Sequence, residues 1–436
     1  MIKKEIQNLI EESIKKLQRE GIFPMFKIPC FYIEEPGVEK YGDYSSNAAL
    51  VLSKIADRSS REIAEKIEKN LDKKNEIIKK TEVAGAGFIN FFISKKYLQD
   101  QIPEIIKQKK KFGALEIGAK QKVNIVFISA NPTGPLTLGN GRGGFCGDVL
   151  ANVLDKAGYK TTREYYINDR GAQITKLGHS VLGDSEAVYK GEYINNLRKE
   201  LLGNPMSQLG HRVSQPTAEE VGQMAVKIIL NEMIKPSVKK MVIHFDVWFS
   251  EKTLYDKGLV DKAIKDLSKN GHTYESEGAV WFKCKNLGDD KDRVLVRKDG
   301  IKTYIASDIA YLENKISRGF KKIILFLGAD HYGYLARLGA AARVLGFDKQ
   351  NLSAIVMQLV RLFKDGREVR MSKRTGTYVT IDELIDEVGL DAARFFFLTR
   401  SSDTHLNFDM DLAKKQSAEN LPFWHLRYLT RSFRFS

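Results

Sequence analysis

Residues 129–144 read Ser-Ala-Asn-Pro-Thr-Gly-Pro-Leu-Thr-Leu-Gly-Asn-Gly-Arg-Gly-Gly. They follow a short apolar, β-branched run at residues 123–128, which is typical of a strand buried on both faces. They precede apolar residues at helical spacing, 145–157, and Gly158 is suited to end that helix. Strand, glycine-rich turn and helix predict a corner where backbone N–H groups favour anions and a phosphate can approach closely. The alternative is a tight turn that needs positive φ at Gly139 or Gly141.

A second polar loop, far along the chain, reads Arg370-Met371-Ser372-Lys373-Arg374-Thr375-Gly376. It lies between an apolar run and the start of a helix. A lysine in such a loop is usually only solvated, so the loop by itself predicts no chemistry.

The middle of the chain predicts an α/β fold with a doubly wound parallel sheet. Strand candidates alternate with helical stretches, which favours parallel strands joined by βαβ crossovers. In such sheets ligands bind outside the carboxyl ends of the strands, where both loops are expected. The strand candidates are residues 123–128, 162–167, 323–327 and 355–360.

The length of 436 residues predicts two or three domains. We expect an N-terminal α+β domain at residues 1–112 and a Rossmann-like catalytic domain at 113–383. A mostly helical insertion is expected within the latter at about 179–290. Residues 384–436 are expected to begin a helical domain that is truncated, since the chain after Asn420 loses its earlier character. The acidic run at 289–292 lacks the spacing of a calcium loop and predicts a solvated loop.

The composition is that of a globular protein, with 43% hydrophobic and 29% charged residues. The formal net charge of +15 favours a polyanionic partner such as nucleic acid, although general lysine richness is an alternative. No apolar run reaches membrane-spanning length. Three scattered cysteines suggest a reducing cytoplasm, and no protein-held metal is predicted.

The two loops together resemble the paired HIGH and KMSKS signatures of class I aminoacyl-tRNA synthetases. Residues 304–311, 325–334 and 360–383 resemble, in order and spacing, the motifs of one family within that class, the arginyl-tRNA synthetases. Residues 41–50 and 83–90 are similar to the family's N-terminal tRNA-elbow-binding domain. The resemblance extends to about Asn420. It implies a cytoplasmic, monomeric ligase that joins L-arginine to tRNA(Arg) through an arginyl-adenylate, using ATP with Mg²⁺.

Neither step of that reaction needs a protein nucleophile, because the enzyme aligns reactants and stabilises charge on phosphate oxygens. A guanidinium calls for a carboxylate that accepts two parallel N–H bonds, for which Asp308 is the candidate. Tyr304, one helical turn earlier, would form a wall of that pocket. A charge at a helix N-terminus is the alternative role for Asp308.

The resemblance implies further site residues. Ser129 and Asn131 would hold the α-ammonium and carboxylate of arginine, although Asn131 also suits an Asn-Pro turn. Asp330 and His331 are further arginine-binding candidates, with His331 equally suited to a core hydrogen bond. Catalytic roles fall to Thr137, Gly139, Asn140 and Lys373. The ATP-binding set is Pro132, Gly134, Leu138, Gly139, Asn140, Gly141, Gln358, Met371, Ser372 and Lys373.

Two features depart from the family pattern. Thr137 and Asn140 occupy the positions of the two signature histidines and cannot carry an imidazolium charge. The chain also stops at Ser436, where family members continue into a helical anticodon-binding domain. These departures leave open a catalytically weakened tRNA-binding paralogue, or a class I synthetase for another amino acid.

Overall fold

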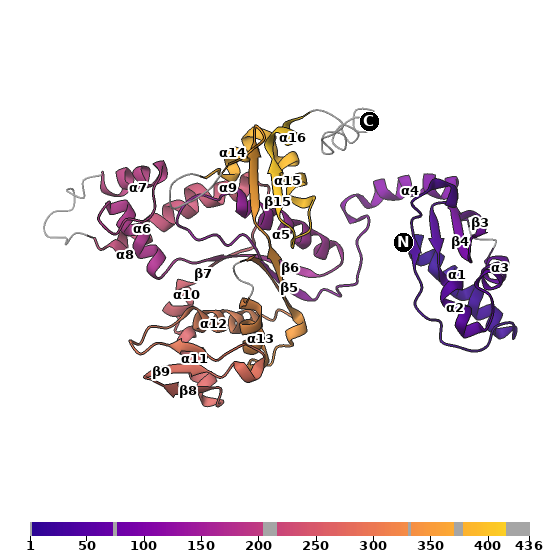
Figure 1. Cartoon of the computed structure of the whole chain (residues 1–436), viewed down its shortest axis with the longest axis horizontal. Helices are drawn as coiled ribbons and strands as arrows, with labels where there is room; N and C mark the ends of the chain where they lie inside the picture. The colour runs from indigo at the N-terminus through magenta and orange to yellow at the C-terminus, as the bar shows by residue number, and fades with distance from the viewer. Residues whose placement is uncertain (1, 73–75, 204–215, 330–332, 370–377, 416–436) are drawn as a thin grey trace. The chain divides into compact units, whose positions relative to one another are not determined.

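The computed structural model describes residues 2–72, 76–203, 216–329, 333–369 and 378–415 (Figure 1). Asp330, His331, Met371, Ser372 and Lys373 therefore lie outside the described residues. The chain divides into two compact units, Met1–Gly113 and Ala114–Ser436. Each unit is described by itself below.

The N-terminal unit packs helices on a four-stranded antiparallel sheet of order β1-β2-β4-β3. Helix α3 starts as its sequence predicts, because the Ser59 hydroxyl accepts the Glu62 backbone N–H. Apolar faces of α1, α2, α3 and β4 form one core in this unit. The elements are α1 (Ile2–Arg19), β1 (Ile33–Glu34), β2 (Tyr44–Ser46), α2 (Ala48–Ala56), α3 (Ser60–Lys69), β3 (Ile78–Ala84), β4 (Phe88–Ile93) and α4 (Lys95–Gln108).

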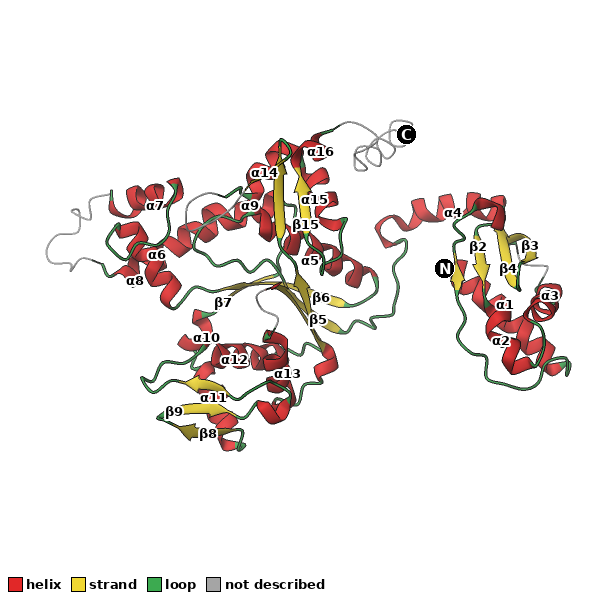
Figure 2. Ribbon diagram, in the orientation of Figure 1, coloured by secondary structure: helices red, strands yellow, loops and turns green. Residues whose placement is uncertain are grey.

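The second unit is built on a five-stranded parallel sheet of order β12-β11-β5-β6-β7 (Figure 2). From β5 the chain runs outward through β6 to β7, and later through β11 to β12 on the other side. The point of reversal lies between β5 and β11, which is where a doubly wound sheet opens a crevice for a ligand. The strands are β5 (Lys122–Val126), β6 (Lys160–Ile167), β7 (Val247–Ser250), β11 (Lys322–Gly328) and β12 (Leu352–Met357).

Two apolar cores cover the two faces of this sheet. Val123 and Ile125 of β5, and Phe127 directly after it, lie in the core that contains helix α5, whereas Val126 lies in the core that contains α12 and α13. The helices are α5 (Leu138–Lys156), α6 (Ala172–Leu182), α7 (Glu192–Leu202), α8 (Ala218–Ile228), α9 (Lys235–Lys240), α10 (Lys252–Asp256), α11 (Leu259–Lys269), α12 (Tyr304–Ser317) and α13 (Tyr334–Val344).

The insertion expected at about 179–290 is not one continuous insertion. Strand β7 lies inside this range and pairs in parallel with β6, so helices α6–α9 form the crossover between two strands of the main sheet. Only the part after β7 carries a separate antiparallel sheet, formed by β8 (Thr273–Ser276), β9 (Ala279–Phe282) and β10 (Arg293–Val296). The prediction failed because β7 is a four-residue, half-buried edge strand surrounded by strongly helical sequence.

The division expected at residue 384 is also wrong. Helix α14 (Ile381–Val388) spans it, and α15 (Leu390–Leu398) packs on α5. Strand β15 (Leu406–Asp409) pairs in parallel with β13 (Val360–Lys364), which in turn pairs with β14 (Arg367–Val369). Helix α16 (Met410–Lys414) follows. The described part of this segment thus shares a sheet with residues on the other side of the expected boundary.

Candidate functional site

Polar residues follow the carboxyl ends of four of the five parallel strands, β5, β6, β7 and β12. Ser129 and Asn131 follow β5, Asn168 follows β6 and Glu251 follows β7 directly. Gln358 follows β12 in the same way. Because parallel strands end at one edge, these residues share one rim of the sheet.

The turn after β5 has an unusual backbone. Ile128 and Ser129 have φ values of 60° and 40°, in the left-handed region that non-glycine residues seldom adopt. The Ser129 hydroxyl accepts the Tyr166 N–H at 3.0 Å and donates to the Phe127 carbonyl at 3.3 Å. Such backbone strain is found at functional sites, where surrounding contacts maintain it.

The residues after Ser129 are held by three side chains that the sequence did not indicate as functional. The Tyr165 hydroxyl donates to the Ala130 carbonyl at 3.1 Å, and the Asn168 amide donates to Asn131 Oδ1 at 2.9 Å. The Tyr193 hydroxyl of α7 donates to the Thr133 carbonyl at 2.9 Å. These contacts come from segments 35 to 60 residues away, so no local pattern signals them.

Thr137 and Asn140 bond to each other at the start of α5. Asn140 Oδ1 accepts both the Thr137 backbone N–H at 2.9 Å and its hydroxyl at 3.1 Å. This arrangement satisfies groups at the helix N-terminus that would otherwise lack partners. The residues that replace the signature histidines therefore define where the helix begins.

Gly139, Gly141, Gly143 and Gly144 lie within α5, and none of them has positive φ. The helix begins at Leu138, seven residues before the apolar stretch that predicts it. A Cβ on Gly141 would lie 2.7 Å from Ile381, and one on Gly147 would lie 2.4 Å from the Phe127 ring. Gly139 is different: it is exposed, and the nearest atom to a Cβ there is the Thr137 hydroxyl at 3.9 Å. The turn alternative is thus wrong, and close packing explains Gly141 but not Gly139.

The second signature, residues 370–377, lies outside the described residues, but the chain on its C-terminal side is held against the first. The Leu138 N–H donates to the Val379 carbonyl at 3.1 Å, and the Ile381 N–H donates to the Leu136 carbonyl at 3.0 Å. Thr137 and Thr380 form an antiparallel bridge. Segments more than 240 residues apart therefore lie side by side.

A cavity of about 610 Å³ opens at the point where the strand order reverses. Residues of β5, β11 and the inward face of α12 line it, together with the turn after β5. The predicted residues on its wall are Ser129, Asn131, Asn140, Tyr304 and Asp308. Tyr304 is 72% exposed, so it lies at the mouth and does not close the pocket.

Asp308 lies in the second turn of α12, and the first turn carries no acidic residue. The role as a helix N-terminal charge is therefore wrong. Burial raises the pKa of Asp308 to about 7, despite a hydrogen bond from Tyr334 and the charges of Arg337 and Lys315, which act in the opposite direction. The nearby Glu251 carboxylate raises it further.

Glu251 is the main acidic residue that sequence reasoning missed. It is 4% exposed, and burial raises its pKa, while a hydrogen bond with Ser307 and the charge of Arg170 oppose that rise. Its position directly after β7 was the available signal, but β7 itself was not recognised. Two buried carboxylates that repel each other form a site that a cation would stabilise.

The α12 side of the cavity also carries a buried cation. Lys315 is 2% exposed and its ammonium lies 4.0 Å from the centre of the Tyr311 ring. Burial lowers the pKa of Lys315 to about 7, although the charge of Glu164 opposes this. Glu164, fully buried on β6, accepts hydrogen bonds from Tyr311 of α12 and from Arg318, the residue after this helix, and so fixes α12 against the sheet.

Of the predicted ATP-binding residues that the structure describes, only Asn140 lines this cavity; the others, Pro132, Gly134, Leu138, Gly139, Gly141 and Gln358, do not. Leu138 is fully buried in the α5 core, and Gly141 is packed against Ile381. Pro132 and Gly134 are also buried, the latter against the Tyr193 ring. Contact between the Leu138 side chain and a ligand is therefore excluded, because the core already surrounds it.

The N-terminal unit contains a cavity of about 640 Å³ of its own. Exposed aromatic rings, Phe88, Tyr32 and Tyr41, lie on its wall beside the amides of Asn47 and Asn90. Aromatic faces beside amide groups suit an unstacked nucleobase.

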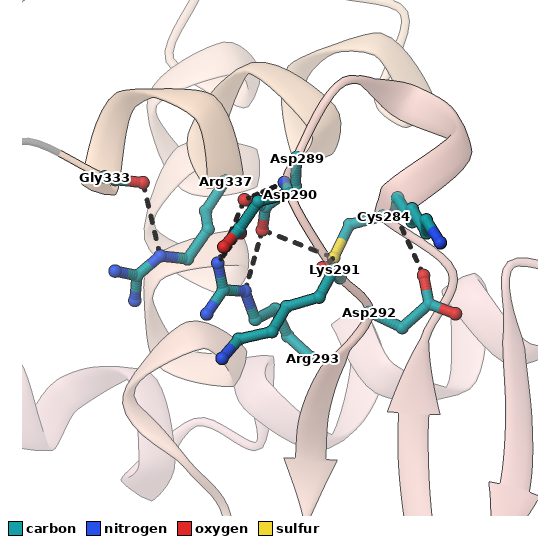
Figure 3. Close-up of polar contacts among 9 residues, drawn as sticks. Cys284, Asp289, Asp290, Lys291, Asp292, Arg293, Gly333 and Arg337 are labelled. Atoms are coloured by element: carbon teal, nitrogen blue, oxygen red, sulfur yellow. Dashed lines mark hydrogen bonds and ion pairs between the residues drawn. The ribbon is translucent and has the colours of Figure 1, made fainter.

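The acidic run at 289–292 is not a freely solvated loop. Asp289 is buried, and its carboxylate accepts Arg293 Nε at 2.8 Å and Nη2 at 3.0 Å (Figure 3). Burial acts to raise the pKa of Asp289, but the bonds from Arg293 outweigh it and hold the pKa low. The buried Cys284 thiol donates to the Lys291 carbonyl at 3.0 Å in the same cluster. These bonds fold the loop onto itself, so its role is structural.

Among the described residues, none of the helices has the length and apolar character that a membrane crossing requires. The same residues contain no group of three or more His, Cys, Asp or Glu side chains suited to a metal ion.

Comparison with known proteins identifies the family. The family model described as "tRNA synthetases class I (R), catalytic domain" matches residues 101–409. The model described as "Arginyl tRNA synthetase N terminal domain" matches residues 4–93. The chain belongs to the arginyl-tRNA synthetase family. It is 44% identical to an arginine–tRNA ligase of Acetivibrio thermocellus, over 98% of this chain and 78% of that protein. It is 42% identical to the arginine–tRNA ligase of Bacillus subtilis, over 98% and 79%.

The fold of this arginyl-tRNA synthetase family member is also similar to a solved structure, that of Thermus thermophilus arginyl-tRNA synthetase. The TM-score is 0.71 at 20% identity, covering 97% of this chain and 80% of the other. The doubly wound class I fold predicted from the sequence is confirmed.

Proposed function

We propose that this chain is an arginine–tRNA ligase, which activates L-arginine with ATP and transfers it to tRNA(Arg). One observation carries the proposal: a single cavity is lined both by Asn140 of the first signature and by the buried carboxylate Asp308. This supports a nucleotide-binding corner beside an acceptor for a guanidinium.

The arginine side chain would lie with its guanidinium at Asp308, near Glu251. Burial raises the pKa of both carboxyl groups, and the charge of Glu251 raises that of Asp308 further; a planar cation with five N–H donors relieves that cost. Asn131, which lines the same cavity and is held by Asn168, would bind the α-ammonium or carboxylate. Ser129 keeps its predicted role as a proposal, although its hydroxyl already serves Tyr166 and Phe127.

ATP would bind at the start of α5. Gly139 is exposed with open space around its Cα, so a ribose or phosphate can approach its backbone. Thr137 and Asn140 would offer their remaining hydrogen-bonding capacity to phosphate oxygens. Lys373 would neutralise the leaving pyrophosphate, and the backbone bonds of Val379 and Ile381 support its closeness to Gly139. Magnesium would arrive bound to ATP as part of the substrate.

The N-terminal unit would bind tRNA through its own cavity, with Phe88 stacking on a base and Asn47 or Asn90 bonding to it. The net charge of +15 supports a polyanionic partner. We also propose that the protein works as a monomer in the cytoplasm. Sedimentation at equilibrium tests the monomer directly, and a mass of two chains would contradict it.

The test of this function is ATP–pyrophosphate exchange with and without tRNA, using arginine, lysine, glutamine or cysteine. We expect exchange with arginine alone, because the neutral side chains of glutamine and cysteine leave the buried carboxylates unpaired, and the lysine ammonium lacks the planar fork that pairs with a carboxylate through two N–H bonds. Exchange with another of these amino acids would show a different specificity. Tight tRNA binding without any exchange would favour the paralogue that has lost turnover.

A further inference from the structure

Arg142, in the second turn of α5, is an arginine buried inside the protein. Its side chain has no exposed surface. Nη1 donates to the Gln358 carbonyl at 2.9 Å, and Nη2 donates to the Ser401 carbonyl at 2.7 Å. One guanidinium thus joins three segments that are distant in sequence.

Each of the three segments belongs to the candidate ATP site or leads to it. Arg142 lies two residues after Asn140 on the signature helix. Gln358 follows β12 at the rim of the sheet, and β13 and β14 continue from it to the second signature segment. Ser401 belongs to the turn after α15, and the neighbouring Ser402 carbonyl accepts the Gln358 N–H at 2.9 Å.

Stability alone does not account for this arginine. Burial disfavours the charged guanidinium, and Arg142 Nε is buried with no hydrogen-bond partner among the described residues. A well-packed apolar side chain in such a place is often as stable as a buried charge or more so. The guanidinium must therefore provide something that packing does not, and what it provides here is a fixed link between two carbonyl groups.

We propose that Arg142 is a positioning residue for the ATP half of the reaction. By holding the Gln358 segment against the signature helix, it sets the distance between Gly139 and the chain that carries the second signature. Because Arg142 also bonds to the Ser401 carbonyl, the distance between Gly139 and that chain depends on the position of the turn after α15. This inference rests on the proposed function, since it assigns Arg142 a role in the activation of arginine by ATP.

The link lies away from Asp308, whereas Asn140, two residues before Arg142 on the signature helix, lines the ATP side of the cavity. Arg142 does not line the cavity that contains Asp308, and neither Gln358 nor Ser401 does. Loss of the link should therefore affect the use of ATP much more than the binding of arginine.

The chain offers a matched control at the same interface. Arg394 of α15 bonds to Asp148 of α5, and its guanidinium lies 5.6 Å from the centre of the Phe145 ring. Like Arg142, this residue ties α5 to the segment around α15. Within the described part of the chain its guanidinium bonds to Asp148 and not to Gln358, so it reports on the stability of the interface alone.

The experiment measures arginine-dependent ATP–pyrophosphate exchange, in the presence of tRNA, for the wild type, Arg142→Met, Arg142→Lys and Arg394→Met. For Arg142→Met we expect kcat/KM for ATP to fall by about 10- to 100-fold, as small misplacements of reacting groups do. The KM for arginine should change by less than about threefold. Arg142→Lys keeps the charge but has no fork to reach both carbonyls, so its loss should be intermediate.

Arg394→Met should lower the melting temperature while its folded fraction keeps wild-type kinetics. The inference is overturned if Arg142→Met behaves in the same way, or if its KM for arginine rises as much as its use of ATP falls. If Arg142→Met fails to fold, Arg142→Lys carries the same test. A wild type without arginine-dependent exchange would instead overturn the proposed function.

Discussion

Asp308 is the residue on which recognition of a cation depends. Burial raises its pKa to about 7, and the groups that face it are Tyr334, Glu251, Arg337 and Lys315. A guanidinium binds the ionised carboxylate, so binding to the protonated form must release a proton. The affinity for arginine should therefore depend on pH near neutrality.

Between about pH 8 and pH 6 the affinity for arginine should fall by about tenfold, because the ionised fraction of a group with a pKa near 7 falls by that factor. Calorimetric titration of arginine across this range measures it, with ATP as the control ligand. An arginine affinity that is constant from pH 6 to pH 8, or that falls in parallel with that of ATP, would contradict the assignment to Asp308.

The same shift affects stability in the free protein. The folded-state pKa of Asp308 lies above its unfolded value of about 3.9, so the folded state binds the proton more tightly. The contribution of this group to the free energy of unfolding is thus favourable at low pH and is lost as pH rises from about 4 to 7. Bound arginine should restore it, so arginine should raise the melting temperature more at pH 8 than at pH 6.

At the scale of single residues, side chains that belong to a recognisable motif could be predicted from the sequence. Side chains that act through contacts with distant segments could not. Asp308, Asn131 and Asn140 could be predicted, because their motifs resemble those of a known family. Tyr193 and Glu251 could not, since the first acts from α7 and the second follows a strand that was not recognised. The hydrogen bonds between Thr137 and Asn140 could not be predicted from the sequence either.

Helix α5 shows how packing fixes the site at the scale of one element. Its glycines are spaced so that strand β5 and helices α14 and α15 approach its backbone closely. A methyl group at Gly147 would lie 2.4 Å from the Phe127 ring, whereas no atom lies within 4 Å of one at Gly143. Substitution by alanine at these two positions therefore distinguishes the effect of close packing, at Gly147, from the effect of helix propensity, at Gly143.

Gly147→Ala should lower the free energy of unfolding by about 1–3 kcal/mol, the usual cost of overpacking a core. Gly143→Ala should leave it unchanged or raise it by about 0.5–1 kcal/mol, because alanine restricts the unfolded chain and favours helix. Urea denaturation of both variants gives the comparison. Equal destabilisation by the two substitutions would show that the packing described for α5 is wrong.

The long central elements could be predicted and the short ones could not. β5 and β11 are mostly apolar runs with clear boundaries, which is typical of buried parallel strands, and β6 ends in aromatic and β-branched residues. β7 and β15 are four residues each. β7 pairs with β6 of the five-stranded sheet and β15 pairs with β13 of a separate sheet, so both depend on strands that are distant in sequence. Strands of this kind are recognised only in the tertiary structure. For this reason the sequence did not predict the true bounds of the insertion or the continuation of the fold past residue 384.

At the scale of the whole molecule, charge should govern the encounter with tRNA. A net charge of +15 together with phosphate contacts implies release of counterions on binding. The affinity for tRNA should fall by about tenfold or more between roughly 50 and 200 mM salt, while that for arginine changes little. Filter binding at several salt concentrations measures the slope, and a flat response would argue against phosphate contacts.

The central claim is that the carboxyl edge of one parallel sheet brings a nucleotide-binding helix start and a guanidinium acceptor into one cavity. Formation of arginyl-tRNA by the wild type and by Asp308→Asn, measured side by side with labelled arginine, tests it most directly. We predict that the wild type charges tRNA and that kcat/KM for arginine falls by about 100-fold or more in Asp308→Asn, with the KM for ATP nearly unchanged. Equal charging by the two proteins would contradict the account.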